Sequence, residues 1–372
     1  MNVGITCYPT VGGSGAVAAE LGKQLARRGH SVHFVSYRLP FRLDEFSDNI
    51  TFHEIDVSTY SLFEYPPHDL ALSAKMAEVA REHRLDVFHV HYAIPHAITG
   101  FLAQQMLGEE APRLITTLHG TDVTLVGQDP SFFEITRFGI ERSQGVTAVS
   151  EFLKRMTVEE FDVRNPIEAI PNFVDLSLYA PRAHRDRTAV AGPGDKVLLH
   201  VSNFRPVKRV LDVVRIFERV HREVLSVLLM VGEGPERASA QALARRLGLQ
   251  GRVRFMGRQD RVEDIMSLAD VFLLPSELES FGLSALEAMA AGVPVVGSDA
   301  GGLPEVVKHA ETGFLLPVGD IEGMAARALE ILKDEEHQRG LGQAGRRRAA
   351  ALFSADRVVS QYEKYYEKVL GQ

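Results

Sequence analysis

Residues 270–299 of the 372-residue chain are DVFLLPSELESFGLSALEAMAAGVPVVGSD. Two short apolar runs, at 270–276 and 294–299, bound this stretch, and continuous apolar runs of this length are typical of strands buried on both faces. Between them, a short apolar helix begins at Gly282 and ends before Gly292, a residue that commonly stops helices. This order of strand, helix and strand predicts a parallel sheet covered by helices.

The same alternation of short apolar runs and helical segments extends along the whole chain. In the first half we predict strands at 3–8, 31–36, 86–91, 113–119 and 145–150. In the second half we predict strands at 196–202, 226–232, 252–257, 270–276, 294–299 and 313–317. The predicted fold class is therefore α/β, with two Rossmann-like, doubly wound domains that face a central cleft.

The boundary between the two predicted domains lies near residues 170–175, IPNFVD. We expect an N-terminal domain over 1–170 and a C-terminal domain over 171–353. The polar stretch 180–195, which contains proline and glycine, predicts a surface loop at the start of the second domain. The last segment, about 354–372, has apolar residues at helical spacing, and it either closes the second domain or packs back onto the first.

Composition and charge exclude several classes of protein. The chain is 45% hydrophobic and 24% charged, and its 41 basic and 49 acidic side chains give a net charge of -8, so a nucleic-acid partner is not expected. The single cysteine, Cys7, cannot form an internal disulfide and fits a reducing compartment. No apolar run has the roughly 18 residues of a membrane span. We expect a cytoplasmic protein without integral membrane contact, as a monomer or a homo-oligomer.

A glycine-rich turn follows the first predicted strand. Gly12, Gly13 and Gly15 surround Ser14 just before a helix begins. Glycines allow the backbone to approach an anion, and a helix N-terminus offers free amide groups with a partial positive charge. This turn is either an anion site or a simple tight turn.

Several histidines gather near the ends of two predicted strands. His119 ends the strand at 113–119, and residues 89–96, HVHYAIPH, add three histidines and Tyr92 after another strand. A zinc site typically has two histidines four residues apart on a helix with a carboxylate nearby, and the sequence has no evident example. We therefore expect neither a metal nor a cofactor.

A basic loop, SNFRPVKRV at 202–210, follows the first strand of the second half. It is either a solvated loop or a phosphate site. Arg205 and Lys208 are well suited to two adjacent phosphates, because arginine has a planar fork of donors and lysine carries a point charge.

Two glutamates, Glu279 and Glu287, lie eight positions apart around the start of the helix in the opening stretch. Either one alone could simply offset the helix dipole. Carboxylates repel phosphate, however, and a carboxylate accepts hydrogen bonds from two neighbouring hydroxyl groups. A ligand with a diphosphate and with diols at each end is a nucleotide-sugar, so we expect one glutamate at the ribose and one at the sugar.

Three motifs of the second half carry a family resemblance. SELESFGLSALEAMAAGVPVV at 276–296, followed by GGLPEVV at 301–307 and TGFLLP at 312–317, resembles the retaining glycosyltransferases of family four. The resemblance extends over nearly the whole chain. It implies two Rossmann-like domains of the GT-B type, a nucleotide-sugar held mainly by the second domain, and no requirement for a metal.

The resemblance implies a role for each matching residue. Glu287 would hold the ribose and Glu279 the hydroxyls of the transferred sugar. Arg205 and Lys208 would hold the diphosphate, and His119 would contact the sugar near the reacting centre; with Glu279 these form the expected catalytic set. The expected donor site also includes Asn203, Gly257, Phe281, Gly282 and Leu283.

The first half resembles one branch of this family, which joins N-acetylglucosamine to L-malate in the first step of bacillithiol biosynthesis. The matching strings are GITCYPTVGGSG (4–15), PFRLDEF (40–46), EYPPHDL (64–70), HVHYAIPHA (89–97) and TLHGTDVTLVGQDPSF (117–132). This implies UDP-N-acetylglucosamine (UDP-GlcNAc) as donor. Ser14 and the amides of Gly12 and Gly13 would bind one malate carboxylate, with Tyr92 and Thr117 beside it, and Arg205 could meet the other.

The chemistry implied is substitution at an anomeric carbon with retention, in which the leaving diphosphate takes the proton of the acceptor. Many relatives carry an arginine where this chain has Asn203, which leaves open which basic side chain meets which phosphate. Three alternatives remain: another acceptor, a UDP-sugar epimerase on the same scaffold, and a sensor that binds a nucleotide-sugar without turnover. Fold analogy alone does not choose among them.

Overall fold

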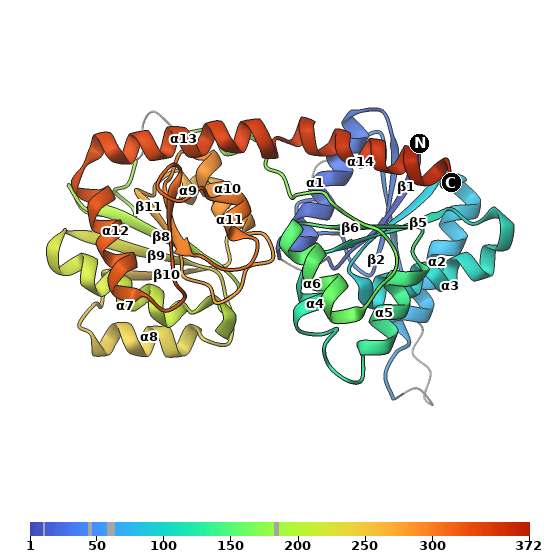
Figure 1. Ribbon diagram of the computed structural model, residues 1–372, viewed down its shortest axis with the longest axis horizontal. Coiled ribbons are helices and arrows are strands. Elements are labelled where there is room, and N and C mark those ends of the chain that lie inside the picture. The colour runs from blue at the N-terminus through green and yellow to red at the C-terminus, as the bar shows by residue number, and fades with distance from the viewer. Residues whose placement is uncertain (10–11, 44–46, 58–63, 182–185) are drawn as a thin grey trace. The chain divides into compact units, whose positions relative to one another are not determined.

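A computed structural model describes residues 1–9, 12–43, 47–57, 64–181 and 186–372 (Figure 1). Parts of three sequence predictions lie outside the described residues: positions 10 and 11 before the glycine turn, 44–46 of the string at 40–46, and 182–185 of the predicted surface loop. The chain divides into two compact units. Unit 1 comprises Met1–Asn172 and Asp356–Gln372, and unit 2 comprises Phe173–Ala355.

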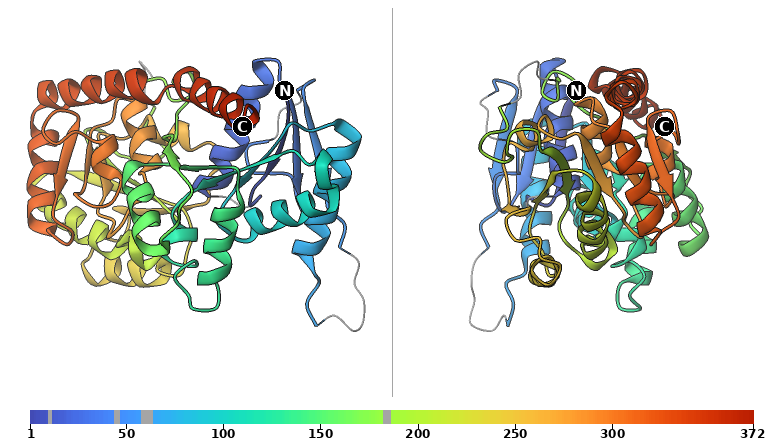
Figure 2. Two further views of the ribbon diagram at one scale, coloured as in Figure 1. Left: turned by 45° about the vertical axis from the view of Figure 1, so that its right-hand side comes forward. Right: turned by 90° about the vertical axis from the view of Figure 1, so that its left-hand side faces the viewer.

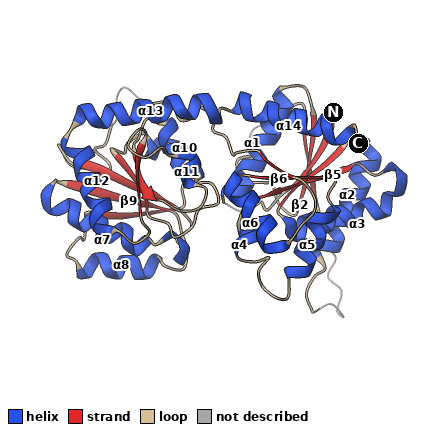
Figure 3. Ribbon diagram, in the orientation of Figure 1, coloured by secondary structure: helices blue, strands red, loops and turns tan. Residues whose placement is uncertain are grey.

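Unit 1 is built on a parallel sheet with helices on both faces (Figures 1 and 3). Its strand order is β3-β2-β1-β4-β5-β6-β7. The strands are β1 (Asn2–Thr6), β2 (Ser31–Ser36), β3 (Ile50–Glu54), β4 (Val87–His91), β5 (Arg113–Leu118), β6 (Gly145–Ala148) and β7 (Ile167–Ala169). The helices are α1 (Gly13–Arg27), α2 (His68–His83), α3 (Ile98–Leu107), α4 (Thr121–Thr124), α5 (Phe133–Arg142), α6 (Glu151–Phe161) and α14 (Ala355–Leu370). Short helical turns lie at Ala93–Ala97 and Gly108–Glu110.

Unit 2 contains a second parallel sheet, with the strand order β10-β9-β8-β11-β12-β13. Its strands are β8 (Lys196–Val201), β9 (Ser226–Val231), β10 (Val253–Gly257), β11 (Val271–Leu274), β12 (Val295–Ser298) and β13 (Gly313–Leu316). Its helices are α7 (Val210–Glu223), α8 (Arg237–Arg246), α9 (Val262–Met266), α10 (Leu283–Ala290), α11 (Leu303–Val306), α12 (Ile321–Lys333) and α13 (Glu335–Phe353), with a short turn at Pro206–Lys208.

The amphipathic pattern of the sequence explains these layers. Helix α7 buries Val213, Phe217 and Val220 against the apolar strands of unit 2, and its exposed positions carry charged side chains. Side-chain caps fix the starts of the last long helices of the unit. Asp320 accepts from the Gly323 amide at α12, and Asp334 accepts from the amides of Glu336 and His337 at α13. No described helix has the length and apolar character that crossing a membrane requires.

The predicted α/β class is confirmed, and all eleven predicted strands are present. The sequence missed the two strands at the edges of the first sheet, β3 and β7. Strand β3, ITFHE, has no fully buried residue and therefore lacks an apolar run, and β7 is only three residues long. Edge strands of this kind give weak sequence signals because only one side of the strand is paired.

The strand orders define one switch point in each unit. In unit 1 the chain leaves β1 towards β2 and later returns to place β4 on the other side of β1. In unit 2, β9 and β11 likewise lie on opposite sides of β8. Loops that leave the carboxyl ends of neighbouring strands diverge there, and in open α/β sheets ligands bind in the crevice that this opens.

Helix α14 is part of unit 1, and both chain termini lie near each other on that unit (Figures 1 and 2). Arg28 Nη1 donates to Glu363 Oε2 at 2.7 Å on the outside of the helix. On the inside, the hydroxyl of Tyr366 lies 2.7 Å from Nδ1 of His89, which is fully buried in the sheet. The far side of His89 contacts Thr117 Oγ1 at 2.6 Å. The C-terminal helix therefore completes a buried polar network in the first unit.

Replacing Tyr366 with phenylalanine is expected to destabilise unit 1 by about 1–3 kcal/mol, because His89 Nδ1 then loses its hydrogen-bond partner in a dry environment. Urea unfolding followed by circular dichroism measures this loss. Tyr65→Phe removes the same hydroxyl from a side chain that is 78% exposed, and it should be nearly neutral. Equal stability of the two variants would show that the buried contact contributes nothing.

Candidate active site

An ion pair joins the two loops that diverge at the switch point of unit 2. Lys208, from the loop after β8, donates through Nζ to Oε1 of Glu279, from the loop after β11, at 2.7 Å. The hydroxyl of Ser276 donates to the same oxygen at 2.7 Å. Glu279 is only 8% exposed. The structure thus brings together two of the predicted catalytic residues and fixes the glutamate by two donors.

The backbone around Glu279 depends on glycines. The Gly302 amide donates to the Glu279 carbonyl at 2.7 Å, and a Cβ on the neighbouring Gly301 would lie 2.0 Å from that carbonyl oxygen. Gly301 also has a φ of +63°. Gly282, which precedes α10, has a φ of +98°, which side chains other than glycine rarely adopt. The motif at 276–296 therefore fixes the position of a carboxylate as well as a helix start.

Glu287 lies further along α10 and has a different partner. The hydroxyl of Tyr179 donates to its Oε1 at 2.6 Å, and the glutamate is 6% exposed. The segment that carries Tyr179 is itself held in place, because Nη1 of Arg346 on α13 donates to the Tyr179 carbonyl at 3.1 Å. The two predicted carboxylates therefore lie on one motif but have distinct, fixed surroundings.

The structure distinguishes the three basic side chains of the loop after β8. Arg209 Nη2 pairs with Oδ2 of the buried Asp212 at 2.6 Å, so it is occupied within its own helix start. Lys208 contacts Glu279, as described above. Arg205 is exposed and has no acidic partner in the described part of the chain. Lys208 and Arg205 therefore remain the candidates for contact with phosphate.

The other predicted donor residues are more scattered. Asn203 is exposed on the loop after β8, and Leu283 is partly buried at the start of α10. Phe281 is 3% exposed and packs edge-on against Phe353, with 5.7 Å between ring centroids, so its ring is part of the core. The place of Phe281 in the donor site stays a prediction. Gly257 ends β10, with β9 between that strand and β8.

The predicted anion turn of unit 1 has the expected local form in its described part. Helix α1 begins at Gly13 with Gly12 before it, and its first turn contains no acidic residue. Gly12 and Gly13 are exposed and Ser14 is half-buried. The first main-chain bond of the helix runs from the Ala16 amide to the Gly12 carbonyl. The amides before Ala16 lie at the positive end of a four-turn helix.

His119 lies in a group of aromatic rings at the carboxyl ends of β4 and β5. Its ring stacks on that of His91, with 5.0 Å between centroids, and its centroid lies 5.4 Å from that of Tyr92. The buried Asp122 accepts from the amides of His119 and Gly120, at 3.2 and 2.8 Å, and so fixes the turn that follows β5. Burial raises the pKa of Asp122, and these backbone donors oppose that effect.

The hydrogen bond between the two histidine rings indicates their tautomers. Nδ1 of His91 lies 2.8 Å from Nε2 of His119, while Nε2 of His91 is buried without a partner among the described residues. Burial lowers the pKa of His119 to about 3 and that of His91 well below its usual value, so both rings are neutral and carry one N–H each. The His91 proton lies on Nδ1, because a buried N–H on Nε2 would have no acceptor. His119 therefore accepts at Nε2 and carries its own proton on Nδ1.

Tyr92 and Thr117 have different positions. Tyr92 is half-buried beside His119 and Tyr8, with a φ of +88°, and its amide donates to the Thr117 carbonyl at 2.9 Å. The Thr117 side chain is fully buried and contacts His89 and Thr147, at 2.6 and 2.7 Å. Thr117 thus belongs to the core network that α14 completes, and its contact with an acceptor stays a prediction.

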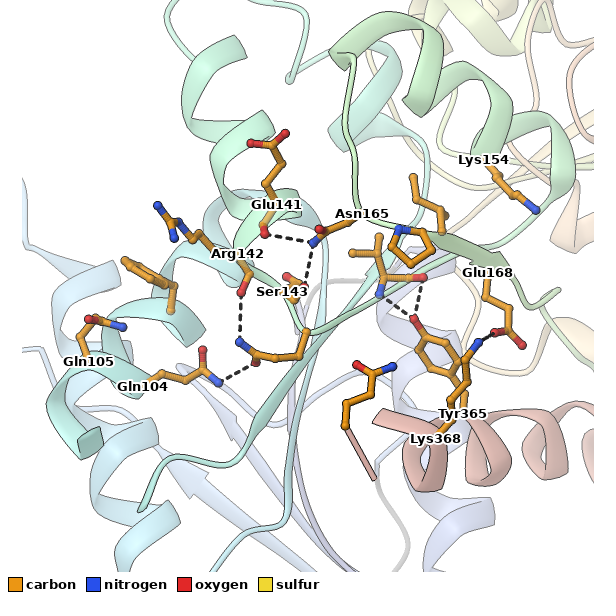
Figure 4. Close-up of a pocket in the computed structure, with 16 residues that line it drawn as sticks. Gln104, Gln105, Glu141, Arg142, Ser143, Lys154, Asn165, Glu168, Tyr365 and Lys368 are labelled. Atoms are coloured by element: carbon orange, nitrogen blue, oxygen red, sulfur yellow. Dashed lines mark hydrogen bonds and ion pairs between the residues drawn. The ribbon is translucent and has the colours of Figure 1, made fainter. Parts of the chain in front are cut away.

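A separate pocket of unit 1 lies at the amino ends of strands β6 and β7 (Figure 4). It is lined by residues at the starts of β6 and β7 and by α14, including Gln144, Asn165 and Tyr365. These polar groups bond to one another or to the backbone; Asn165 Nδ2, for example, donates to the Ser143 carbonyl at 2.9 Å. Because this pocket is at the amino ends of the strands, the switch points remain the candidate site.

Sequence reasoning missed four polar side chains that orient the candidate residues or their loops. Asp122 does this in unit 1, and Ser276, Tyr179 and His200 do it in unit 2. Ser276 and Asp122 each lie three positions from a predicted residue, a spacing typical of local side-chain bonds. Tyr179 gave no such signal because Glu287 is 108 positions away, and the bond of His200 to the Leu273 carbonyl spans 73 positions. His200 Nδ1 donates to the Leu273 carbonyl at 2.9 Å, and its Nε2 lies 2.7 Å from the Ser202 hydroxyl at the end of β8.

Comparison with known proteins agrees with this geometry. A family model described as Glycosyltransferase Family 4 matches residues 11–178, and one described as Glycosyl transferases group 1 matches residues 184–348. The chain belongs to the family-four glycosyltransferases, as the motif at 276–296 predicted. It is 50% identical over 372 residues to the N-acetyl-alpha-D-glucosaminyl L-malate synthase of Bacillus anthracis, with 100% of this chain and 97% of that protein covered.

Solved structures with the same fold are more distant in sequence. Sucrose-phosphate synthase from Thermosynechococcus elongatus has a TM-score of 0.82 at 24% identity, covering 100% of this chain and 99% of that one. Anabaena HepE in complex with UDP-glucose has a TM-score of 0.83 at 19% identity, covering 99% and 100% of the two chains. These likenesses confirm the fold of two Rossmann-like domains.

The free energy of unfolding is expected to fall as the pH decreases from 6.5 to 4, because of His200. Burial lowers the pKa of this residue from 6.5 to about 4, so within that window the unfolded chain binds a proton that the folded chain excludes. The contribution is roughly 3 kcal/mol. Urea unfolding of the wild type and His200→Gln across this range measures it, and the variant should have the shallower slope.

The His200 ring also provides a direct test in the folded protein. Its NMR signals should stay those of a neutral imidazole down to about pH 4. Titration near pH 6.5 without unfolding would contradict the burial argument.

Proposed function

We propose that this protein is a retaining glycosyltransferase that moves N-acetylglucosamine from UDP-GlcNAc to the hydroxyl group of L-malate. The observation that carries the proposal is the 50% identity over the full chain to an enzyme named for that product. The positions of Lys208, Glu279 and Glu287 around one switch point support the nucleotide-sugar half of it. The Gly12–Ser14 turn at the start of α1 supports the acceptor half.

In the proposed donor site, Lys208 and Arg205 neutralise the diphosphate. Lys208 is already beside Glu279, so its ammonium group can bridge a phosphate oxygen and the carboxylate. Both observed bonds of Glu279 use Oε1, and Oε2 then accepts from the hydroxyls of the transferred sugar. Glu287 holds the ribose diol. A carboxylate has about four acceptor positions, so its bond from Tyr179 leaves capacity for a diol.

In the proposed acceptor site, one malate carboxylate binds the amides at the start of α1, with the Ser14 hydroxyl as a further donor. His119 directly follows β5, which belongs to the same sheet as β1, the strand before this turn. Its Nδ1–H donates to a sugar oxygen, and the low pKa of the ring keeps it neutral in that role. His91 positions this donor by fixing the tautomer of His119.

The proposed reaction exchanges one bond at the anomeric carbon for another on the same face. The bond from that carbon to the diphosphate oxygen breaks while the malate hydroxyl oxygen bonds to the carbon. The proton of the hydroxyl passes to the departing diphosphate. Lys208 and Arg205 stabilise the developing negative charge and so provide what a divalent metal provides in other transferases. We therefore propose that transfer needs no metal at the diphosphate.

Glu287→Gln is expected to weaken binding of UDP by about 1–3 kcal/mol, because an amide loses the charge-assisted acceptors that a ribose diol uses. The substitution keeps the shape of the side chain and an oxygen for Tyr179, so folding should be retained. Isothermal titration calorimetry measures the affinity. Glu311→Gln, at an exposed position of unit 2, serves as the matched control. Unchanged UDP affinity in Glu287→Gln would remove this residue from the donor site.

L-malate is expected to be a far better acceptor than lactate, which lacks the second carboxylate. Two anchored carboxylates orient the hydroxyl for attack, whereas one leaves it free to rotate. Ser14→Ala should raise the KM for malate more than the KM for UDP-GlcNAc, as steady-state assays of UDP release would show. Equal rates with both acceptors, or a Ser14 variant impaired only towards the donor, would leave a family-four transferase with another acceptor.

A further inference from the structure

Three histidines that the proposed function does not use converge on one side of the first sheet. His33 is on β2, His53 is on β3, and His83 is the last residue of α2. One ring nitrogen from each lies within 4.8 Å of those from the other two. We propose that these three side chains form a zinc(II) site, separate from the substrate sites.

The topology explains how residues so far apart in sequence meet. Strands β2 and β3 are neighbours in which His33 pairs with Thr51, so His53, two positions further along β3, projects from the same face as His33. Helix α2 covers this face, where it packs on Val35. Its C-terminal residue His83 lies beside the start of β1, because its carbonyl accepts from Asn2 Nδ2 at 3.0 Å.

The ring geometry is close to that of a coordinated metal. His33 Nδ1 lies 3.0 Å from His53 Nε2, and the rings of His33 and His83 are stacked with 4.2 Å between centroids. Tetrahedral zinc with bonds of about 2.0–2.1 Å to nitrogen separates two ligand atoms by about 3.3 Å. The first pair is already near that separation, and the third ligand needs a shift of about 1.5 Å at most.

A neighbouring side chain prepares His33 as a ligand. The Ser31 hydroxyl lies 3.0 Å from His33 Nε2, so the ring can donate its proton there and present a bare nitrogen at Nδ1. Second partners of this kind orient metal-bound histidines in known sites. Without metal, the His53 Nε2–H donates to His33 Nδ1. On metal binding, the His53 proton moves to its own Nδ1, and each ring stays neutral with one N–H.

The surroundings favour zinc over harder cations. Three imidazoles suit zinc, whereas magnesium and calcium prefer oxygen ligands. His33 is buried, but His53 and His83 are half-exposed, so water can take the fourth coordination position. Glu82 Oε1 lies 3.9 Å from His83 Nε2 and adds negative charge beside the rings. Burial lowers the pKa of His33 to about 4, which keeps this ring neutral at pH 7.

The site would stabilise one edge of the sheet in unit 1. Strand β3 has no fully buried residue and pairs with β2 alone. A metal bound to His33, His53 and His83 links β3, β2 and α2 through three strong contacts. Binding to the folded form alone raises stability with metal concentration. No sequence pattern indicates this site, because its ligands are separated by 20 and 30 positions on three different elements.

The experiment uses the full chain without a polyhistidine tag, loaded with zinc and dialysed against metal-free buffer. Elemental analysis should find one zinc per chain in the wild type and less than a tenth in His53→Gln and in His83→Gln. His68→Gln, at the exposed start of the same helix, should keep one zinc. Far-UV circular dichroism confirms that the variants are folded.

Two further measurements report on the site itself. Cobalt(II) in place of zinc should give the intense visible bands of a four-coordinate ion in the wild type and in His68→Gln, but not in His53→Gln. Zinc should raise the melting temperature of the wild type and leave that of His53→Gln unchanged. A wild type that retains no zinc, or retention of one zinc by either His53→Gln or His83→Gln, would overturn the proposal.

Discussion

The ion pair between Lys208 and Glu279 is the contact on which the candidate site of unit 2 depends. It joins two loops that leave neighbouring strands in opposite directions, and it places a cation and a carboxylate side by side at the point where they diverge. Because the same oxygen of Glu279 also accepts from Ser276, the carboxylate is oriented before any ligand arrives. Preorganised charge of this kind stabilises a developing charge without reorganisation during the reaction. The parallel sheet thus determines where the chemistry can occur, and the motif at 276–296 determines which groups are there.

Much of this architecture is predictable from the sequence, and the parts that are not share a physical reason. Continuous apolar strands and glycine-bounded helices locate the core of both sheets, and the glutamates at 279 and 287 led to the prediction of a ligand with hydroxyl groups. By contrast, the burial of Thr117 and the partnership of Tyr179 with Glu287 depend on contacts between residues 30 to 108 positions apart. Periodicity describes only which face of an element is buried. It does not identify which side chain from a distant element completes a polar bond there.

The first unit holds histidines in two groups that differ in their surroundings. His91 and His119 lie at the carboxyl ends of the strands, where the bond from His91 fixes the tautomer of His119. His53 lies on the edge strand β3 and His33 on its neighbour β2, where a metal would link these strands to α2. Burial keeps members of both groups neutral, since the charged form loses its hydration. In our proposals, neutral imidazole serves as a hydrogen-bond donor in the first group and as a metal ligand in the second.

The configuration of the product is the most direct test of the proposed same-face transfer to the malate hydroxyl. Purified protein would be incubated with UDP-GlcNAc and L-malate, and the anomeric proton of the product examined by NMR. In the proposed reaction the diphosphate leaves from the face that the hydroxyl attacks, so we predict an α-linked N-acetylglucosaminyl malate, formed from the α-linked donor without a trapped glycosyl-protein. A β-linked product, or no malate conjugate with an active, folded enzyme, would contradict the account.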